Sequence, residues 1–263
     1  MGPHERWTAL LDILGRDSRL EVGAAAAELK VSAATIRRDL DHLASQQLLT
    51  RTRGGAAPAS VAYDLPLRYK SGHHTEAKAR IGAAAAALIR PGAVVALNGG
   101  TTTSEVARAL VTAAAPSAEA MADGRAFTVV TNALNIANDL AVRRTIKLVV
   151  TGGVARPSSY ELIGPLAEPG LSKLHLDYVV LGVDGFDLEV GATAHHEGEA
   201  AVNAMMVAQA STVIVVADGS KLGRRSFARI CGVDQVDVLV TDPTADEAQL
   251  AEFAAADIRI VTA

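Results

Sequence analysis

The sequence has one cysteine and no long apolar run. Cys231 is the only cysteine among 263 residues, so an internal disulfide is impossible. We interpret its thiol as a small buried hydrophobic group, with a catalytic thiol as the other interpretation. No uninterrupted apolar stretch approaches the roughly 18 residues that a membrane span needs, and the first residues, MGPHERW, carry charges where a signal peptide has its apolar core. These absences predict a soluble cytoplasmic protein.

Aromatic residues are also scarce. They make up 3% of the chain, whereas hydrophobic residues as a whole make up 49%. A composition dominated by Ala, Val, Leu and Gly is typical of helices packed closely on a buried parallel sheet. The length suits one large α/β domain or two smaller ones.

The chain has no excess of positive charge, but its two parts differ. The formal net charge of −4 argues against a protein that coats nucleic acid without selectivity. Residues 1–60 hold eight Lys or Arg against seven Asp or Glu, and the remaining residues hold 17 against 22. Four arginines of the first part, Arg37, Arg38, Arg51 and Arg53, lie close together in the sequence, so the positive potential there is local.

The first thirty residues predict two short helices. Apolar residues recur at helical spacing from Trp7 to Leu14, and Gly15 ends that pattern. The Ala-rich segment 22–30 then predicts a second helix, whose small side chains allow close approach to a neighbour.

A third helix is predicted to begin after Ser32 and to run to about Ser45. Ser32 suits the N-cap because its hydroxyl can accept a hydrogen bond from a free backbone N–H. The apolar stripe of this helix, which we expect to face the core, consists of Ile36, Leu40 and Leu43. Arg37 and Arg38 therefore lie on other faces.

Two helices joined by a short turn, the second one carrying small and polar residues and then two arginines, are typical of a helix-turn-helix that enters the DNA major groove. The following segment, LLTRTRGGAA, alternates apolar and polar residues as a two-stranded wing does. The residues predicted to contact bases or phosphates are Ser32, Ala34, Thr35, Arg37, Arg38, Arg51, Arg53 and Gly54. The alternative is that the arginine pair merely solvates an exposed face, with one arginine paired to Asp41.

Residues 59–75, which contain Pro, Ser and Gly, are predicted to link a domain at 1–58 to a larger domain at 76–263. Short, β-branched apolar runs follow at 93–97, 127–131, 147–151, 178–183, 212–217, 237–241 and 258–262. Such runs, separated by segments long enough for crossover helices, predict a doubly wound α/β fold with a parallel sheet. Sheets of this kind bind ligands in a crevice beyond the carboxyl ends of the strands.

Polar residues follow several of these predicted strands. Residues Asn98 to Ser104 combine glycines, hydroxyls and the start of a helix, which suits an anion. Gly-Gly followed by Thr also builds turns that bind no anion, so this alternative stays open. The spacing matches neither the phosphate loop of nucleotide-binding proteins nor the dinucleotide motif, which counts against ATP or NAD, and no cofactor is predicted.

Other polar residues at strand ends have two interpretations each. Lys221 could bind a phosphate, and Asp184, Asp218 and Glu197 could accept hydrogen bonds from sugar hydroxyls. A solvated lysine and ordinary Asp-Gly turns are the alternatives. His195 and His196 are adjacent, so their rings point to different sides, and no second cluster completes a metal site. We therefore predict no metal.

The segment SAATIRRDLDHLASQQLLTRTRGGA resembles the winged helix-turn-helix of DeoR-type transcriptional regulators. The residues that match its motif are Ser32, Thr35, Ile36, Arg37, Arg38, Asp39 and Leu40. Two residues depart from it. Gln47 stands where the family often has a helix-ending Gly, and Arg53 stands where a His usually precedes the Gly pair, which adds charge.

The segments NGGTTT, VVTNALNIA, VTGGVARPSS, GPLAE, LGVDGFDLEVGAT and ADGSK are similar, in the same order, to the DeoR-type C-terminal sensor domain. This resemblance implies a fold like that of ribose-5-phosphate isomerases and CoA transferases. The effector-binding residues expected on this basis are Asn98, Gly100, Thr101, Thr102, Thr131, Asn132, Gly153, Asp184, Gly185, Glu197 and Lys221. Asn98 replaces the usual Asp, and Val183 replaces a common Ala.

The resemblance implies a DNA-binding regulator, most often a repressor of a carbohydrate catabolic operon, that responds to a phosphorylated sugar and is not an enzyme. The expected partners are double-stranded operator DNA and the effector. One small module contacts few phosphates, so we expect a homodimer or homotetramer. An activator or architectural role stays open. The alternative from another class is a sugar-phosphate isomerase-like enzyme with an accessory DNA-binding module, in which Asp184 or Glu197 is the base and Lys221 stabilises charge.

Overall fold

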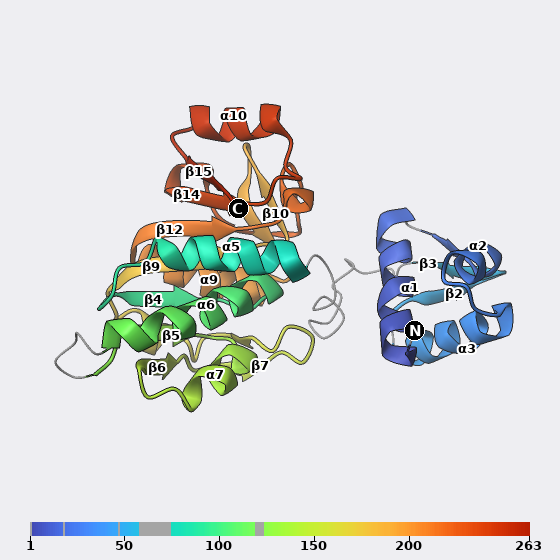
Figure 1. The fold of residues 1–263 in the computed structure, drawn as a ribbon, viewed down its shortest axis with the longest axis horizontal. Helices are drawn as coiled ribbons and strands as arrows, with labels where there is room; N and C mark the ends of the chain where they lie inside the picture. Colours follow the sequence, from blue (N-terminus) through green and yellow to red (C-terminus); the bar gives the residue numbers. More distant parts are fainter. Residues whose placement is uncertain (1, 18, 47, 58–74, 119–123) are drawn as a thin grey trace. The chain divides into compact units, whose positions relative to one another are not determined.

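The computed structural model describes residues 2–17, 19–46, 48–57, 75–118 and 124–263. Gln47 and nearly all of the predicted linker lie outside these residues. The chain forms two compact units, residues 1–73 and residues 74–263, and each is described by itself (Figure 1).

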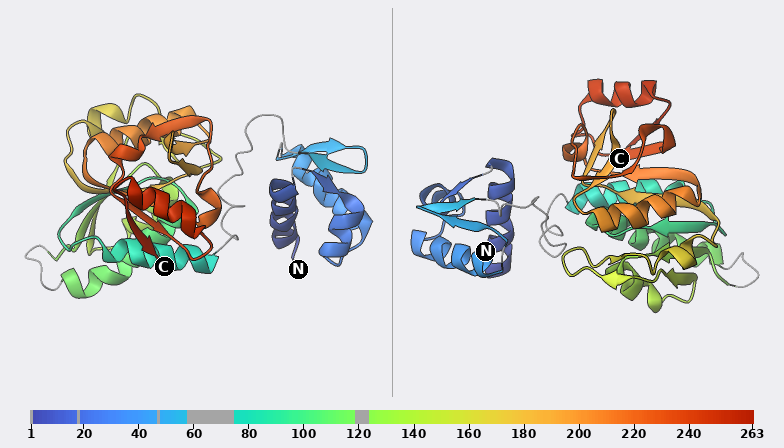
Figure 2. Two further views of the ribbon diagram at one scale, coloured as in Figure 1. Left: turned by 90° about the horizontal axis from the view of Figure 1, so that it is seen from above. Right: turned by 180° about the vertical axis from the view of Figure 1, so that it is seen from behind.

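The described residues of the first unit form three helices and a small antiparallel sheet, drawn in blue in Figure 2. The helices are α1 (Pro3–Asp17), α2 (Val22–Glu28) and α3 (Ala33–Ser45). The strands are β1 (Leu20–Glu21), β2 (Thr50–Thr52) and β3 (Gly55–Ala57), in the order β1-β3-β2. This is the predicted helix-turn-helix with its wing, and β1 is a third strand that the sequence did not reveal.

Helix α3 begins and packs as its sequence predicts. The hydroxyl oxygen of Ser32 accepts a hydrogen bond from the backbone N–H of Thr35 at 3.1 Å, which caps the helix. The stripe of Ile36, Leu40 and Leu43 is fully buried in the core of the unit. This packing fixes which face of α3 is turned to solvent.

Asp39 ties α3 to α1. It is buried, and its carboxylate accepts hydrogen bonds from Arg6 Nε at 2.5 Å and from Trp7 Nε1 at 2.8 Å. A buried carboxylate is tolerated when charged and neutral donors satisfy its oxygens. The motif residue Asp39 therefore holds the helices together and does not face DNA.

Replacing Asp39 should destabilise the first unit. Asp39→Ala leaves the half-buried Arg6 cation without its partner, which should cost about 3 kcal/mol. Asp41→Ala on the exposed side of α3 should cost about 0.5 kcal/mol. Trp7 is the only tryptophan of the chain, so its fluorescence during urea titration follows this unit alone. Equal midpoints for the two variants would contradict this assignment.

The second unit is built on a seven-stranded parallel sheet in the order β15-β14-β12-β9-β4-β5-β6. Its strands are β4 (Val94–Leu97), β5 (Phe127–Thr131), β6 (Ile146–Val150), β9 (Leu176–Gly182), β12 (Ala210–Val216), β14 (Val238–Thr241) and β15 (Arg259–Thr262). Each of the seven predicted runs supplies one of these strands, so the predicted fold class is confirmed.

Helices cover both faces of the sheet, as a doubly wound fold requires. Helices α5 (Thr75–Ala87), α6 (Thr101–Ala118) and α7 (Leu134–Ala141) pack on one core cluster, and α9 (Glu197–Ala208) packs on the other. Along β4, Val95 and Leu97 belong to the first cluster and Ala96 to the second, because successive side chains point to opposite faces. Figure 1 shows α5 and α6 side by side.

The remaining elements were not predicted, because they are short and contain no long apolar run. They are a hairpin of β7 (Val154–Ala155) and β8 (Leu162–Ile163), the short helix α8 (Glu168–Leu171), helix α10 (Glu247–Ala255), and an antiparallel sheet of β10 (Gly185–Asp187), β11 (Gly191–Ala194) and β13 (Ala228–Cys231). The hairpin follows β6 and β10 follows β9, so both begin at the carboxyl ends of the large sheet's strands. Helices α8 and α10 contribute Leu171 and Phe253 to the core cluster that α9 also lines.

The structure bears on two features of the sequence, its single cysteine and its lack of a long apolar run. Cys231 is buried in β13, and burial raises the pKa of its thiol to about 11, so it packs as a small hydrophobic group. Among the residues that the structure describes, no helix is both long and apolar enough to cross a bilayer.

Candidate functional site

Arg37 and Arg38 lie exposed on α3, opposite the buried stripe. Within the described residues, neither guanidinium forms a hydrogen bond or an ion pair. Asp41 is bound by a different cation, since Arg51 Nε lies 2.9 Å from Asp41 Oδ1. The proposed pairing of Asp41 with Arg37 or Arg38 is therefore wrong, and both cations remain available on the surface.

Arg51 makes two contacts within the first unit. Besides its ion pair with Asp41, its Nη1 donates to the backbone carbonyl of Gly55 at 2.6 Å. The first bond ties the wing to α3, and the second joins β2 to β3 within the wing. The predicted phosphate contact of Arg51 stays a prediction, while Arg53 and Gly54 lie exposed where β2 turns into β3.

The start of α3 carries the other predicted DNA-contacting residues. Ser32 and Ala34 are exposed, and Thr35 is half-buried. The hydroxyls of Ser32 and Thr35 lie 2.9 Å apart and share a hydrogen bond, so Ser32 combines its role as a cap with an exposed position.

In the second unit, the chain order of the sheet reverses between β4 and β9. Such a switch point is where open α/β sheets place their ligand sites. Asn98, at the end of β4, donates through Nδ2 to the Gly182 carbonyl at 2.9 Å and accepts from the Gly182 N–H at 2.8 Å. Asn98 is only 2% exposed, so its amide joins β4 to β9, whereas the sequence predicted an effector contact.

The turn from β4 into α6 follows directly. Gly100 adopts a φ of +145°, and its carbonyl accepts hydrogen bonds from the Ser104 N–H at 3.1 Å and the Ser104 hydroxyl at 2.7 Å. The N–H groups of Thr101 and Thr102 precede the first bond within the helix and have no helical carbonyl to pair with. The start of the 18-residue helix α6 is thus a set of backbone donors at a positive helix end.

The end of β5 is fully buried. The Thr131 hydroxyl donates to the Leu97 carbonyl at 2.7 Å and accepts from the Ala133 N–H at 3.0 Å, so it braces two neighbouring strands. Asn132 donates through Nδ2 to Glu161 Oε2 at 2.9 Å. The structure brings both predicted effector residues to the switch-point end of the sheet, but their donors are already used inside the protein.

Asp184 follows β9 and is half-buried. Its Oδ2 accepts from the backbone N–H of His195 at 3.1 Å, and its Oδ1 lies 3.7 Å from His195 Nε2. Gly185 begins β10 next to it, and Gly153 lies just before β7. These predicted residues connect the large sheet to the small elements around its carboxyl end.

Glu197 and Lys221 are the most accessible predicted effector residues with charge. The Glu197 side chain is 71% exposed in the first turn of α9. Lys221 is half-buried in the 3₁₀ turn η1 (Gly219–Lys221), which follows β12. Asp218 is buried and caps this turn by accepting from the Ser220 N–H at 3.1 Å, so it has a structural role.

Glu161, which the sequence did not point out, is a buried acid of this region whose pKa is strongly raised. It lies just before β8, is only 4% exposed, and accepts hydrogen bonds from Asn132 and from the Gly99 N–H. Burial first, and then the charges of Glu199 and Asp184, raise its pKa to about 8, while its two hydrogen bonds act in the opposite direction. The only sequence signal for it was an acid directly before the apolar pair Leu162 and Ile163.

Glu199, on α9, is also buried but has a cation beside it. Its Oε1 accepts from Arg156 Nη1 at 3.0 Å. Both Arg156 and Glu199 were missed from sequence, because one is on the β7–β8 hairpin and the other on a helix far along the chain. Their pairing leaves Glu161 without a cation of its own among the described residues.

The two adjacent histidines, His195 and His196, make different contacts. His195 lies beside Asp184, and His196 Nδ1 accepts from the Gly198 N–H at 3.0 Å as the N-cap of α9. In the described part of the chain, no group of three or more His, Cys, Asp or Glu side chains could hold a metal ion.

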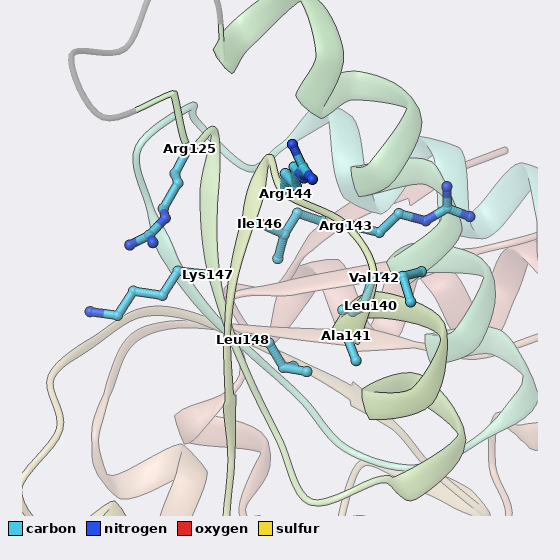
Figure 3. A pocket seen from close by; sticks show the side chains of 9 residues that line it. All are labelled: Arg125, Leu140, Ala141, Val142, Arg143, Arg144, Ile146, Lys147 and Leu148. Carbon is cyan, nitrogen blue, oxygen red and sulfur yellow. The ribbon is translucent and has the colours of Figure 1, made fainter.

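A pocket at the other end of the sheet carries several cations. It lies where α7 ends and β6 begins, and is lined by Arg125, Leu140, Ala141, Val142, Arg143, Arg144, Ile146, Lys147 and Leu148. Its cationic side chains point in different directions and do not converge (Figure 3). The carboxyl ends of the strands, with the residues described above, are at the opposite edge of the sheet.

Comparison with known protein families assigns a domain type to each of the two units. A model of the DeoR C terminal sensor domain matches residues 73–243, and a model of the DeoR-like helix-turn-helix domain matches residues 6–61. The chain belongs to the DeoR family of transcriptional regulators. Its helix-turn-helix domain implies DNA as a partner, and its sensor domain implies a small-molecule effector.

Curated relatives of this DeoR-family chain span nearly its whole length. The HTH-type transcriptional regulator GlpR of Haloferax volcanii is 34% identical over 99% of this chain and 98% of its own. The transcriptional repressor GlcR of Bacillus subtilis is 34% identical over 94% and 92%, and the glycerol-3-phosphate regulon repressor of Escherichia coli is 29% identical over 90% of each.

Solved structures give a more distant likeness. Ribose 5-phosphate isomerase A of Methanocaldococcus jannaschii is 18% identical, with a TM-score of 0.41, over 56% of this chain and 54% of its own.

The raised pKa of Glu161 predicts how stability depends on pH. Because the folded state disfavours the carboxylate, the free energy of unfolding should fall as pH rises from about 4.5 to about 8 and then level off. Glu161→Gln removes this titration, so its sensor-domain melting temperature should exceed that of the wild type at about pH 9 by more than at about pH 5.

Calorimetry of the sensor-domain transition at both pH values measures this difference. Glu168→Gln, an exposed acid at the start of α8, is the matched control and should follow the wild type. Parallel melting curves for Glu161→Gln and the wild type would show that Glu161 ionises normally.

Proposed function

We propose that this chain is a repressor of a carbohydrate catabolic operon, and that a phosphorylated sugar bound to its sensor domain changes its affinity for operator DNA. The observation that carries the proposal is the exposed pair Arg37 and Arg38, which has no partner among the described residues. One face of this helix packs in the core, so the cations on its other face lie at the surface. There they can bind a polyanion such as DNA.

The DNA contact is assigned to the solvent face of α3 and to the wing. Arg37 and Arg38 can each form bidentate hydrogen bonds with a guanine edge or bind phosphate. The small exposed residues at the start of α3, Ser32 and Ala34, allow close approach of the backbone to the groove. In this proposal, Thr35, Arg51, Arg53 and Gly54 add base or phosphate contacts.

The effector is assigned to the carboxyl ends of β4, β9 and β12. A phosphate would bind the free N–H groups at the start of α6, from Gly100 to Thr102, with Lys221 as an additional cation. Asp184 and Glu197 would accept hydrogen bonds from sugar hydroxyls. A relative 29% identical to this chain is the glycerol-3-phosphate regulon repressor of Escherichia coli, and its name supports a phosphorylated ligand.

Operator binding also requires more than one DNA-binding domain. A single small module contacts few phosphates, so useful affinity needs two modules on one assembly that bind two half-sites. We propose a homodimer or homotetramer in the cytoplasm. Effector binding would then shift the population between arrangements that do and do not fit the two half-sites.

The isomerase-like alternative has no comparable support. Relatives that cover at least 90% of this chain are named as regulators or repressors. The carboxylate of Asp184, one of the two candidate bases, is engaged by the backbone of His195.

The DNA half of the proposal is tested by fluorescence anisotropy with a fragment from upstream of the neighbouring genes. Arg37→Ala and Arg38→Ala should each weaken binding about tenfold or more, as expected for loss of a guanidinium contact. Arg143→Ala removes an equally exposed arginine of the sensor domain and should leave affinity unchanged. Wild-type affinity in both helix variants would reject the proposed interface.

The effector half is tested by thermal-shift screening of phosphorylated sugars, with the same sugars lacking phosphate as controls. A true effector should raise the sensor-domain melting temperature in proportion to the logarithm of its concentration. Lys221→Met should abolish most of the shift, because it removes the proposed phosphate cation. Equal shifts with and without phosphate would contradict a phosphate-binding site.

A further inference from the structure

Glu161 lies against the turn proposed to bind the effector's anionic group. Its carboxyl accepts a hydrogen bond from the backbone N–H of Gly99, one residue before Gly100. A Cβ placed on Gly99 would be 2.5 Å from Glu161 Oε1, so only glycine leaves room for the acid here. The Glu161 carboxyl thus occupies the first donor of the turn from β4 into α6.

The groups that face Glu161 come from four other segments. Asn132, after β5, donates to Oε2 at 2.9 Å, Glu199 of α9 and Asp184 after β9 add negative charge, and Gly99 supplies its N–H. The nearby guanidinium of Arg156 binds Glu199, and the ring of His195 lies beside Asp184. Burial without a cation favours a neutral carboxylic acid over a carboxylate.

An anion at this turn and a carboxylate at Glu161 would share adjoining donors. The backbone N–H groups run in sequence from Gly99 through Gly100 to Thr102, and Glu161 takes the first of them. Two negative charges this close, in a site of low solvent access, repel each other strongly. A protonated Glu161 avoids the repulsion, and its O–H can also donate to an effector oxygen.

We propose that Glu161 is a further effector-site residue, and that an anionic group binds the turn from Gly99 to Thr102 only while the Glu161 carboxyl holds a proton. This inference rests on the proposed effector site. One proton from solvent is taken up with each anion wherever the free protein is ionised at Glu161. The site therefore selects ligands that place one anion at this turn and a neutral group beside Gly99.

The pH range of this coupling follows from the raised pKa of Glu161. Below about pH 8 the proton is already present, so anion affinity should not depend on pH. Above about pH 8, affinity should fall by about tenfold per pH unit, because one proton must be added for each anion bound.

The experiment is isothermal titration calorimetry of the full chain with sodium sulfate from about pH 6.5 to about pH 9.5, below the ordinary lysine pKa of about 10.4. Sulfate keeps its charge over this range, so a change in affinity reports on the protein. Two buffers of different ionisation enthalpy at each pH give the number of protons taken up per sulfate. Wild-type protein should take up close to one proton at the highest pH and none at the lowest.

Three variants complete the test. Glu161→Gln, a neutral isostere, should bind sulfate with no proton uptake and no fall in affinity up to about pH 9. Glu168→Gln should behave as the wild type does. Glu199→Gln removes a neighbouring charge and should move the onset of proton uptake to lower pH, which tests the inference even if Glu161→Gln fails to fold.

The outcomes separate this inference from the proposed function. If Lys221→Met abolishes sulfate binding but Glu161→Gln keeps the wild-type pH dependence, the coupling to Glu161 is overturned and the effector site stands. If sulfate does not bind the wild type, or binds Lys221→Met unchanged, the anion site itself is rejected, and this inference with it. An unchanged onset of proton uptake in Glu199→Gln also contradicts the role of Glu161.

Discussion

The amide of Asn98 links the two halves of the large sheet at its switch point. It satisfies both the N–H and the carbonyl of Gly182, and it is buried, so losing it would leave polar backbone groups without partners in a dry environment. The turn into α6 begins one residue after Asn98, and the segment that carries Asp184 begins just after Gly182. The turn into α6 and the segment that carries Asp184 are therefore placed relative to each other by this pair of hydrogen bonds.

Two buried acids show how their neighbours decide the state of a carboxyl group. Asp39 has a guanidinium and an indole N–H within hydrogen-bonding distance, so its negative charge is compensated. Glu161 has one amide and one backbone N–H but faces two further acids, so burial and repulsion raise its pKa. The first acid stabilises the packing of helices, whereas the second is poised to respond to charge nearby.

Several residues predicted to bind the effector turn out to build the site. Asn98 and Thr131 are buried, and their polar atoms bond to the ends of neighbouring strands. A sequence pattern cannot distinguish a residue that contacts a ligand from one that shapes the turn beside it. Both kinds of residue occur at the same positions, directly after the strands. Asp41 shows the same limit in the first unit, since its partner is Arg51 and not the nearer arginines of its own helix.

The sequence by itself determined the helix-turn-helix, the exposed arginine pair and all seven strands of the large sheet, because helical periodicity and short β-branched runs are local properties. Tertiary structure alone decided the strand order, the small elements at the carboxyl edge and the meeting of Gly99, Asn132 and Glu161. These residues are far apart in the chain, and a carboxyl group becomes unusual only through desolvation and neighbouring charges that folding brings together.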